Sequence, residues 1–217
     1  RIRLIPTEEL ILKNNFTNSL AAFQNNLYFL NTYGSLYSIN SDTNRINWFI
    51  NLRISSDTGP NYLFFSNPII IYDDKVIVSS DPYLYVLDVN TGSTILKTNI
   101  TSKVKPIISG NNIFLITKDN MLVSFKVNNG NINYSIRVAD EIASFLKTKK
   151  KSISIKSLQL VNNELYIFLN NSYVVKFNVN GKINKISKLP FDIKSFPLFI
   201  NNSMVFLDKK NKLIILD

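Results

Sequence analysis

The side chains that could carry out acid–base or metal chemistry in this chain are carboxylates, lysines and tyrosines, because its 217 residues include no histidine and no cysteine. This composition excludes a Ser-His-Asp triad, a thiolate nucleophile, a zinc–thiolate site and a haem bound through histidine. No pair of the mid-chain carboxylates lies in a motif for general acid–base catalysis or calcium binding. The carboxylates considered are Asp57, Asp73, Asp74, Asp81, Asp88, Asp119, Glu141 and Glu164. The sequence therefore predicts no catalytic residue, no metal site and no cofactor.

The net charge of +10, from 25 basic and 15 acidic residues, is compatible with binding to nucleic acid or to anionic lipid. Most of the basic residues are lysine, whereas bidentate recognition of phosphate or guanine favours arginine. We interpret the charge as a solvated lysine surface in a chain biased toward Lys, Asn and Ile, and we expect no nucleic-acid partner. The one dense cluster, Lys147 to Lys151, is expected to be a solvated loop, with contact to anionic lipid headgroups as the alternative.

A pattern of paired apolar runs recurs along the chain. In each unit a short turn separates two apolar runs, and a turn rich in Asn or Gly follows, with Gly92 and Gly130 placed where a left-handed residue is needed. The first runs are residues 27–30, 76–78, 113–116, 165–168 and 204–207, and the second runs are residues 33–40, 83–88, 120–126, 173–178 and 212–217. Runs that are apolar at consecutive positions indicate strands buried on both faces.

Burial on both faces is typical of a blade stacked between two other blades. The sequence therefore predicts an all-β fold, a propeller of four-stranded antiparallel blades, with an ordinary β-sandwich as the alternative. We expect one partial propeller over residues 1–217, with both terminal units incomplete. The predicted blade units are approximately 14–52, 62–100, 101–138, 152–189 and 195–217, and their innermost strands are expected within 16–22, 64–71, 103–108, 153–160 and 196–200.

Two insertions interrupt the repeat. Residues 53–61 carry strong turn signals and are expected to form a long surface loop. Residues 139–152 begin with acidic and end with basic side chains, which suits a short helix because of its dipole. Ile142, Phe145 and Leu146 would lie on one face of that helix.

The repeat resembles the quinoprotein-type motif Gly-x-Leu-Tyr-Ala-Leu-Asp-x-x-Thr-Gly-x-x-x-Trp. The first unit matches it at Gly34, Leu36, Tyr37, Ile39, Asn40, Thr43 and Trp48, and the second at Leu84, Tyr85, Leu87, Asp88, Thr91 and Gly92. The resemblance implies that Trp48 packs one blade against the next and that Asp88 is structural. It covers nearly the whole chain and specifies the fold, whereas function must be argued separately.

Two branches of this fold are relevant. One contains dehydrogenases that use pyrroloquinoline quinone (PQQ) and a calcium ion. The other is the lipoprotein family of the outer-membrane β-barrel assembly machinery, the BamB family, and the order and lengths of the units are similar to the C-terminal half of that family. This similarity implies an eight-bladed parent in which an N-terminal strand completes the last blade. The chain begins at Arg1, so we expect any targeting sequence or lipid-attachment cysteine upstream.

The resemblance to the BamB family implies a non-enzymatic periplasmic scaffold at the inner face of the outer membrane, assisting the assembly and insertion of β-barrel proteins. The implied partners are a component of the assembly machinery and unfolded outer-membrane proteins, with membrane proximity through a lipid anchor outside this chain. The alternatives are a fragment of a PQQ-dependent dehydrogenase-type propeller and a generic propeller interaction domain, such as a sensor ectodomain.

The resemblance also implies candidate partner-binding residues. Residues 9–20 are similar to a family segment of the form Leu-x-Leu-Arg-Gly-x-Ser-Ala-Pro, which contributes to docking the central barrel-assembly protein. The matching positions are Leu10, Leu12 and Lys13, and Asp57 matches one member of a second, acidic family patch. The local alternatives are an outer blade strand with ordinary packing for the two leucines and loop capping for Asp57.

Overall fold

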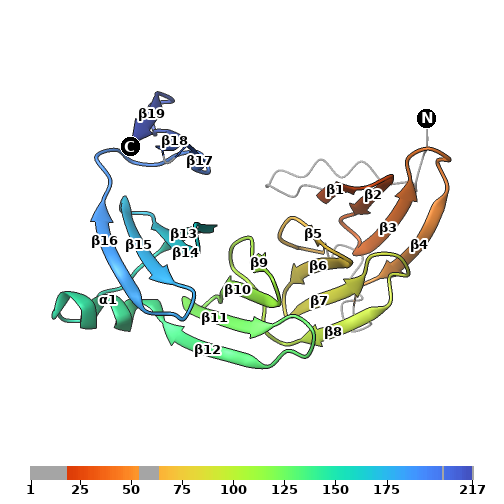
Figure 1. The fold of residues 1–217 in the computed structure, drawn as a ribbon, viewed down its shortest axis with the longest axis horizontal. Coiled ribbons are helices and arrows are strands. Elements are labelled where there is room, and N and C mark those ends of the chain that lie inside the picture. Colours follow the sequence, from red (N-terminus) through yellow and green to blue (C-terminus); the bar gives the residue numbers. More distant parts are fainter. Residues whose placement is uncertain (1–18, 54–63, 202, 217) are drawn as a thin grey trace. The chain divides into compact units, whose positions relative to one another are not determined.

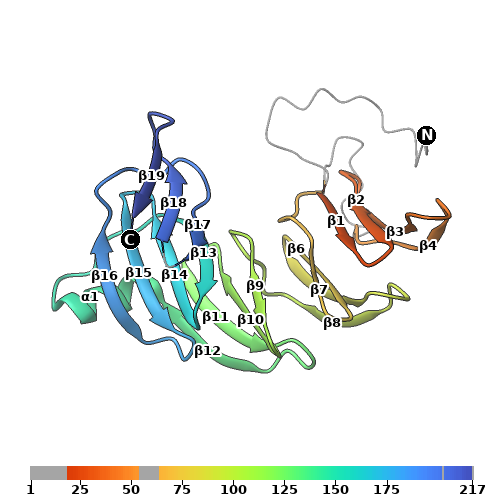
Figure 2. The same cartoon turned by 45° about the horizontal axis from the view of Figure 1, so that its top comes forward.

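The computed structural model describes residues 19–53, 64–201 and 203–216. In this part of the chain it has nineteen strands and one helix, arranged as four four-stranded antiparallel sheets and one three-stranded sheet (Figures 1 and 2). Each sheet is a meander in which sequential strands pair, so the all-β propeller of antiparallel blades is confirmed. The chain divides into two compact units, Arg1–Thr101 and Ser102–Asp217. None of the described helices has the length and apolar character needed to cross a membrane.

The first unit contains two blades. Their strands are β1 (Ser19–Phe23), β2 (Asn26–Leu30), β3 (Ser35–Asn40) and β4 (Ile46–Asn51), followed by β5 (Ile70–Tyr72), β6 (Lys75–Ser80), β7 (Tyr83–Asp88) and β8 (Thr94–Thr98). The two inner strands β6 and β7 are buried over most of their length, as their consecutive apolar residues predict. Tyr28, Leu30 and Leu36 of the first blade pack with Val76, Val78, Tyr85 and Leu87 of the second.

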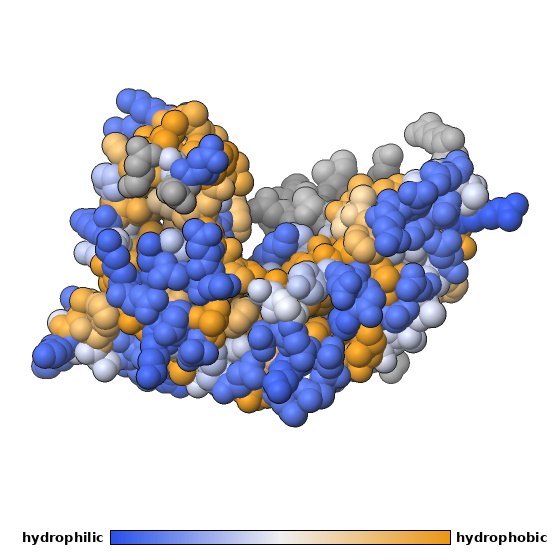
Figure 3. Space-filling model, in the orientation of Figure 1, coloured by the Kyte–Doolittle hydropathy of each residue, from blue (hydrophilic) through white to orange (hydrophobic). Residues whose placement is uncertain are grey.

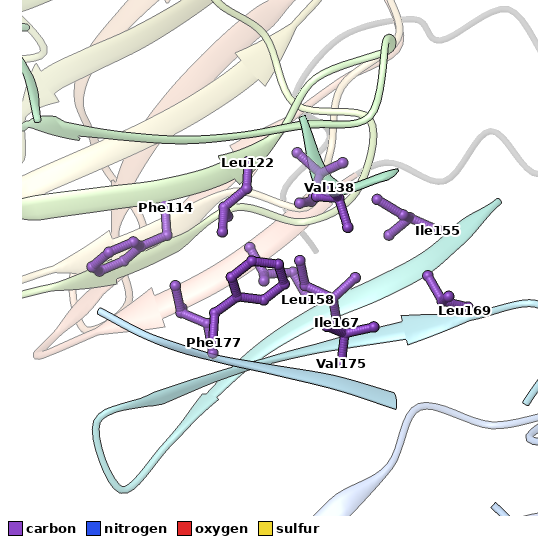
Figure 4. Packing of buried hydrophobic residues seen from close by; sticks show 11 residues of the cluster. Phe114, Leu122, Val138, Ile155, Leu158, Ile167, Leu169, Val175 and Phe177 are labelled. Atoms are coloured by element: carbon purple, nitrogen blue, oxygen red, sulfur yellow. The ribbon is translucent and has the colours of Figure 1, made fainter. Parts of the chain in front are cut away.

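The second unit contains three blades and the helix. Its elements are β9 (Ile107–Ser109), β10 (Asn112–Ile116), β11 (Met121–Lys126), β12 (Ile132–Arg137), α1 (Val138–Leu146), β13 (Ile155–Val161), β14 (Glu164–Leu169), β15 (Tyr173–Asn178), β16 (Ile183–Lys188), β17 (Leu198–Ile200), β18 (Ser203–Leu207) and β19 (Leu213–Leu216). In Figure 4, side chains from β10 and β11 point toward side chains from β13, β14 and β15, with Val138 of α1 at the edge. The apolar faces of neighbouring blades therefore form the core.

Three predictions about the elements need correction. The first blade has all four strands, and among the described residues the last blade has three. Three innermost strands have three residues each and begin near the ends of their predicted ranges, one or two residues after a proline, which cannot donate a ladder hydrogen bond. These strands are β5, β9 and β17, which follow Pro68, Pro106 and Pro197. The helix ends at Leu146, so the lysines follow it and do not form its last turn.

Candidate binding surfaces

The residues that the sequence predicts to bind a partner lie outside the described residues. They are Leu10, Leu12, Lys13 and Asp57. Their roles therefore remain predictions, and the surfaces described below come from other parts of the chain.

The carboxylate of the repeat caps a turn. Asp88 Oδ1 accepts hydrogen bonds from the backbone N–H of Thr91 (2.8 Å) and Asn90 (3.0 Å) and from the Thr91 hydroxyl (2.9 Å). The hydrogen bonds from Thr91 hold the pKa of Asp88 below its usual value. Asn40 Oδ1, at the same position of the first blade, accepts the equivalent bonds from Asp42 and Thr43. The neutral amide of Asn40 thus caps its turn with the same hydrogen bonds as the carboxylate of Asp88, which confirms the structural role of Asp88.

Trp48 joins the first two blades. Its Nε1 donates a hydrogen bond of 3.0 Å to the carbonyl of Val89, which follows β7. Its ring lies so close to Gly92 that an added Cβ would lie 2.5 Å from Cε3. The predicted packing role of Trp48 is therefore confirmed. Tyr134 of β12 packs in the same way against Gly181 of the following blade, and burial raises the pKa of Tyr134 to about 12.

The acidic side chains do not gather. Among the described residues, no group of three or more Asp and Glu side chains is placed to hold a metal ion. Asp208 caps a turn of the last blade by accepting from the backbone N–H groups of Lys210 and Lys212. Asp192 accepts hydrogen bonds from Lys209 and Ser172, which hold the pKa of its carboxyl below the usual value. These carboxylates therefore stabilise turns and loops.

A groove with aromatic and basic walls lies between the fourth blade and the last one. Its volume is about 710 Å³, and its lining includes Tyr166, Lys176, Lys188, Phe199 and Leu216. The rings of Tyr166 and Phe199 meet edge to face with centroids 5.0 Å apart. The Lys176 ammonium lies 4.6 Å from the Tyr166 centroid and 3.8 Å from Glu164 Oε2. Such a wall combines apolar contact with positive charge.

The groove runs beside strand β19. Within the described residues, β19 pairs with β18 alone, so its other edge carries no described strand. The resemblance to the BamB family implies that an N-terminal strand of the parent pairs with this edge and completes the last blade. The sequence did not show that residues of β14, β16 and β17 form a common wall.

Comparison with known proteins gives one curated relative and many similar structures. No family model matches. The relative is the outer membrane protein assembly factor BamB of Legionella pneumophila (strain Paris), 27% identical over 105 residues, which make up 48% of this chain and 26% of BamB. The match thus spans about a quarter of the relative's length.

Two of the similar solved structures represent both branches of the fold. BamB from Moraxella catarrhalis has a TM-score of 0.52 at 10% identity, over 90% of this chain and 70% of that one. Quinohemoprotein alcohol dehydrogenase from Comamonas testosteroni has a TM-score of 0.64 at 12% identity, over 92% of this chain and 41% of that enzyme's chain. At these identities the structures show the fold alone. Together with the sequence match, they show that the chain has the fold of PQQ-like β-propellers and resembles BamB.

Proposed function

We propose that this protein is a non-enzymatic periplasmic scaffold that assists the assembly of outer-membrane β-barrel proteins. The observation that carries the proposal is the sequence match of 105 residues to BamB, an outer membrane protein assembly factor. The fold alone does not choose between the branches, because quinohemoprotein dehydrogenases share it. The two units of the chain would be parts of one propeller, built from the five predicted blade units.

The mechanism would be docking. The carboxylates of the repeat turns are engaged as caps, as Asp88 and Asp208 illustrate. The groove between the fourth blade and the last one offers an aromatic and basic surface to side chains of an unfolded barrel protein. Leu10, Leu12, Lys13 and Asp57 would bind a component of the assembly machinery. The scaffold would work at the inner face of the outer membrane, held there as a lipoprotein.

Capture of the central barrel-assembly protein tests this proposal. We expect the wild-type protein to bind that partner and the double substitution Leu10→Ala with Leu12→Ala to weaken binding by about tenfold or more, since buried apolar anchors at interfaces each contribute about 1–2 kcal/mol or more. The dissociation constant is measured with the purified proteins. A matched control, Leu207→Ala with Leu213→Ala, removes two exposed leucines of the last blade and should leave this binding unchanged.

Two outcomes count against the proposal in different ways. If the double variant binds as tightly as wild type, the docking role of Leu10 and Leu12 is wrong, although the scaffold stands. The second candidate function is that of a quinone-dependent dehydrogenase, because the Comamonas enzyme shares the fold. Absorbance titration with pyrroloquinoline quinone and calcium separates the two, because stoichiometric binding of the quinone would contradict the scaffold.

A further inference from the structure

The C-terminal end of α1 exposes large apolar side chains. At its start Val138 and Ala139 are buried, and in its middle Ile142 packs against the core cluster of the second unit. Phe145 and Leu146 continue the apolar face but remain 47% and 49% exposed. The helix therefore leads from the core to an apolar end whose two large side chains are half-exposed.

A run of basic residues begins where the helix ends. Lys147 closes α1 in the left-handed conformation, with φ of 50°, and its N–H bonds to the carbonyl of Ser144. Lys149, Lys150 and Lys151 follow, and all are exposed. The Lys150 ammonium lies 2.6 Å from Asp140 Oδ1, which ties the run to the first turn of the helix.

A basic pocket adjoins this run. It has a volume of about 520 Å³, and Arg137, Lys150 and Lys151 line it together with Asp119, Asn120 and Ser152. Lys103 reaches the rim, where its ammonium donates to Asn120 Oδ1 at 3.3 Å. The acidic groups in this region are Asp119, Asp140 and Glu141, and the basic side chains outnumber them. The region therefore keeps a positive charge next to exposed apolar groups.

The combination points to one kind of surface. Apolar side chains at a helix end beside a lysine cluster are typical of segments that lie at a membrane interface, where the apolar groups enter the boundary of the acyl chains and the lysines attract anionic headgroups. Figure 3 shows apolar surface of α1 beside strongly hydrophilic surface, at the left of the view. A polyanion such as nucleic acid would neutralise the lysine charges but would leave Phe145 and Leu146 exposed to water.

We propose that the end of α1 and the run Lys147–Lys151 bind the surface of an anionic lipid bilayer. Phe145 and Leu146 insert among the headgroups, and Lys147, Lys149 and Lys151 contact their phosphates. Arg137 and the pocket beside it hold one further phosphate group. This membrane contact goes beyond the proposed scaffold function and does not require an assembly partner.

Flotation with lipid vesicles tests the proposal. The wild-type protein should float with vesicles of phosphatidylcholine containing about one third phosphatidylglycerol, and hardly at all with phosphatidylcholine alone. Binding should weaken as salt is added, because salt screens the charges. We expect binding to the anionic vesicles to weaken on the order of 100-fold, at about fivefold per lysine, in the triple variant Lys147→Gln, Lys149→Gln and Lys151→Gln. Phe145→Ser with Leu146→Ser should weaken it about tenfold or more.

A matched control removes the same charge elsewhere in the second unit. The control replaces three lysines in the turn before β19: Lys209→Gln, Lys210→Gln and Lys212→Gln. The ion pair of Lys209 with Asp192 is exposed, so its loss should cost little stability. This variant should bind the anionic vesicles within about twofold of wild type. The proposal is overturned if this control loses as much vesicle binding as the triple variant at Lys147, Lys149 and Lys151. It is also overturned if the wild-type protein binds heparin but not the anionic vesicles. Circular dichroism confirms that each variant is folded.

Discussion

Replacing Phe177 with alanine should lower the free energy of unfolding by about 3–5 kcal/mol. Phe177 lies on β15, is fully buried, and packs in the cluster between the third and fourth blades (Figure 4). The substitution removes the transfer free energy of the ring and leaves a cavity that the stacked strands cannot close. Denaturant unfolding followed by circular dichroism measures the change.

The control for this variant is a phenylalanine of the same unit that lies near the surface. Phe196 is 53% exposed, so Phe196→Ala should cost less than about 1 kcal/mol. The two variants remove the same atoms and differ mainly in burial. An equal loss in both variants, or no loss in Phe177→Ala, would contradict a core built from stacked blade faces.

Replacing Gly92 with alanine should destabilise the first unit by about 2–4 kcal/mol, for two reasons that add. The residue has φ of +71°, where an L side chain is strained by about 1 kcal/mol. The new Cβ would also lie 2.5 Å from the Trp48 ring, which overpacks the contact between the first two blades. Trp48 is the single tryptophan of the chain, so its fluorescence reports unfolding of this unit.

Gly110 provides the matched control for the backbone. It also has positive φ, at +54°, but a Cβ there would meet nothing within 4 Å. Gly110→Ala should therefore cost only the backbone strain of about 1 kcal/mol, measured by circular dichroism because Gly110 lies in the second unit. In a Trp48→Leu background, where circular dichroism replaces the lost fluorescence, the excess cost of Gly92→Ala should shrink, because the two residues are in direct contact. If Gly92→Ala costs no more than Gly110→Ala, the packing of Trp48 on the second blade is contradicted.

The inner strands of the blades could be predicted because apolar residues at consecutive positions indicate a strand buried on both faces. The run 76–78 and the run 83–88 lie in β6 and β7, which are buried over most of their length. The motif also located the turn of Asp88, which depends on neighbouring residues, and the packing role of Trp48, which depends on the resemblance because its partners Val89 and Gly92 lie on the next blade.

The innermost strands and the helix end were harder to predict. Apolar residues before Pro68 look like strand, but Ser66 forms only an isolated bridge with Ser80, and the regular strand begins at Ile70, after the proline. The acidic-to-basic order of residues 139–152 predicted a helix that includes the lysines, whereas α1 ends at Leu146 with Lys147 in the left-handed conformation. The order of acidic and basic residues therefore indicates a helix but does not show at which residue the helix ends.

The candidate surfaces could not be predicted because they depend on packing between blades. Tyr166 and Phe199 are 33 positions apart and belong to different blades, yet their rings meet in one groove. Arg137 comes beside Lys150 only because α1 folds back after β12. The partner-binding residues Leu10, Leu12, Lys13 and Asp57 came from resemblance alone and lie outside the described residues.

The central claim is that this propeller serves barrel assembly, and the most direct measurement is the amount of folded outer-membrane β-barrel protein in the native host. In a strain that lacks this protein, heat-modifiable barrel proteins in the outer membrane should decrease, and the wild-type gene should restore them. Unchanged levels of folded barrel proteins in that strain would contradict the claim.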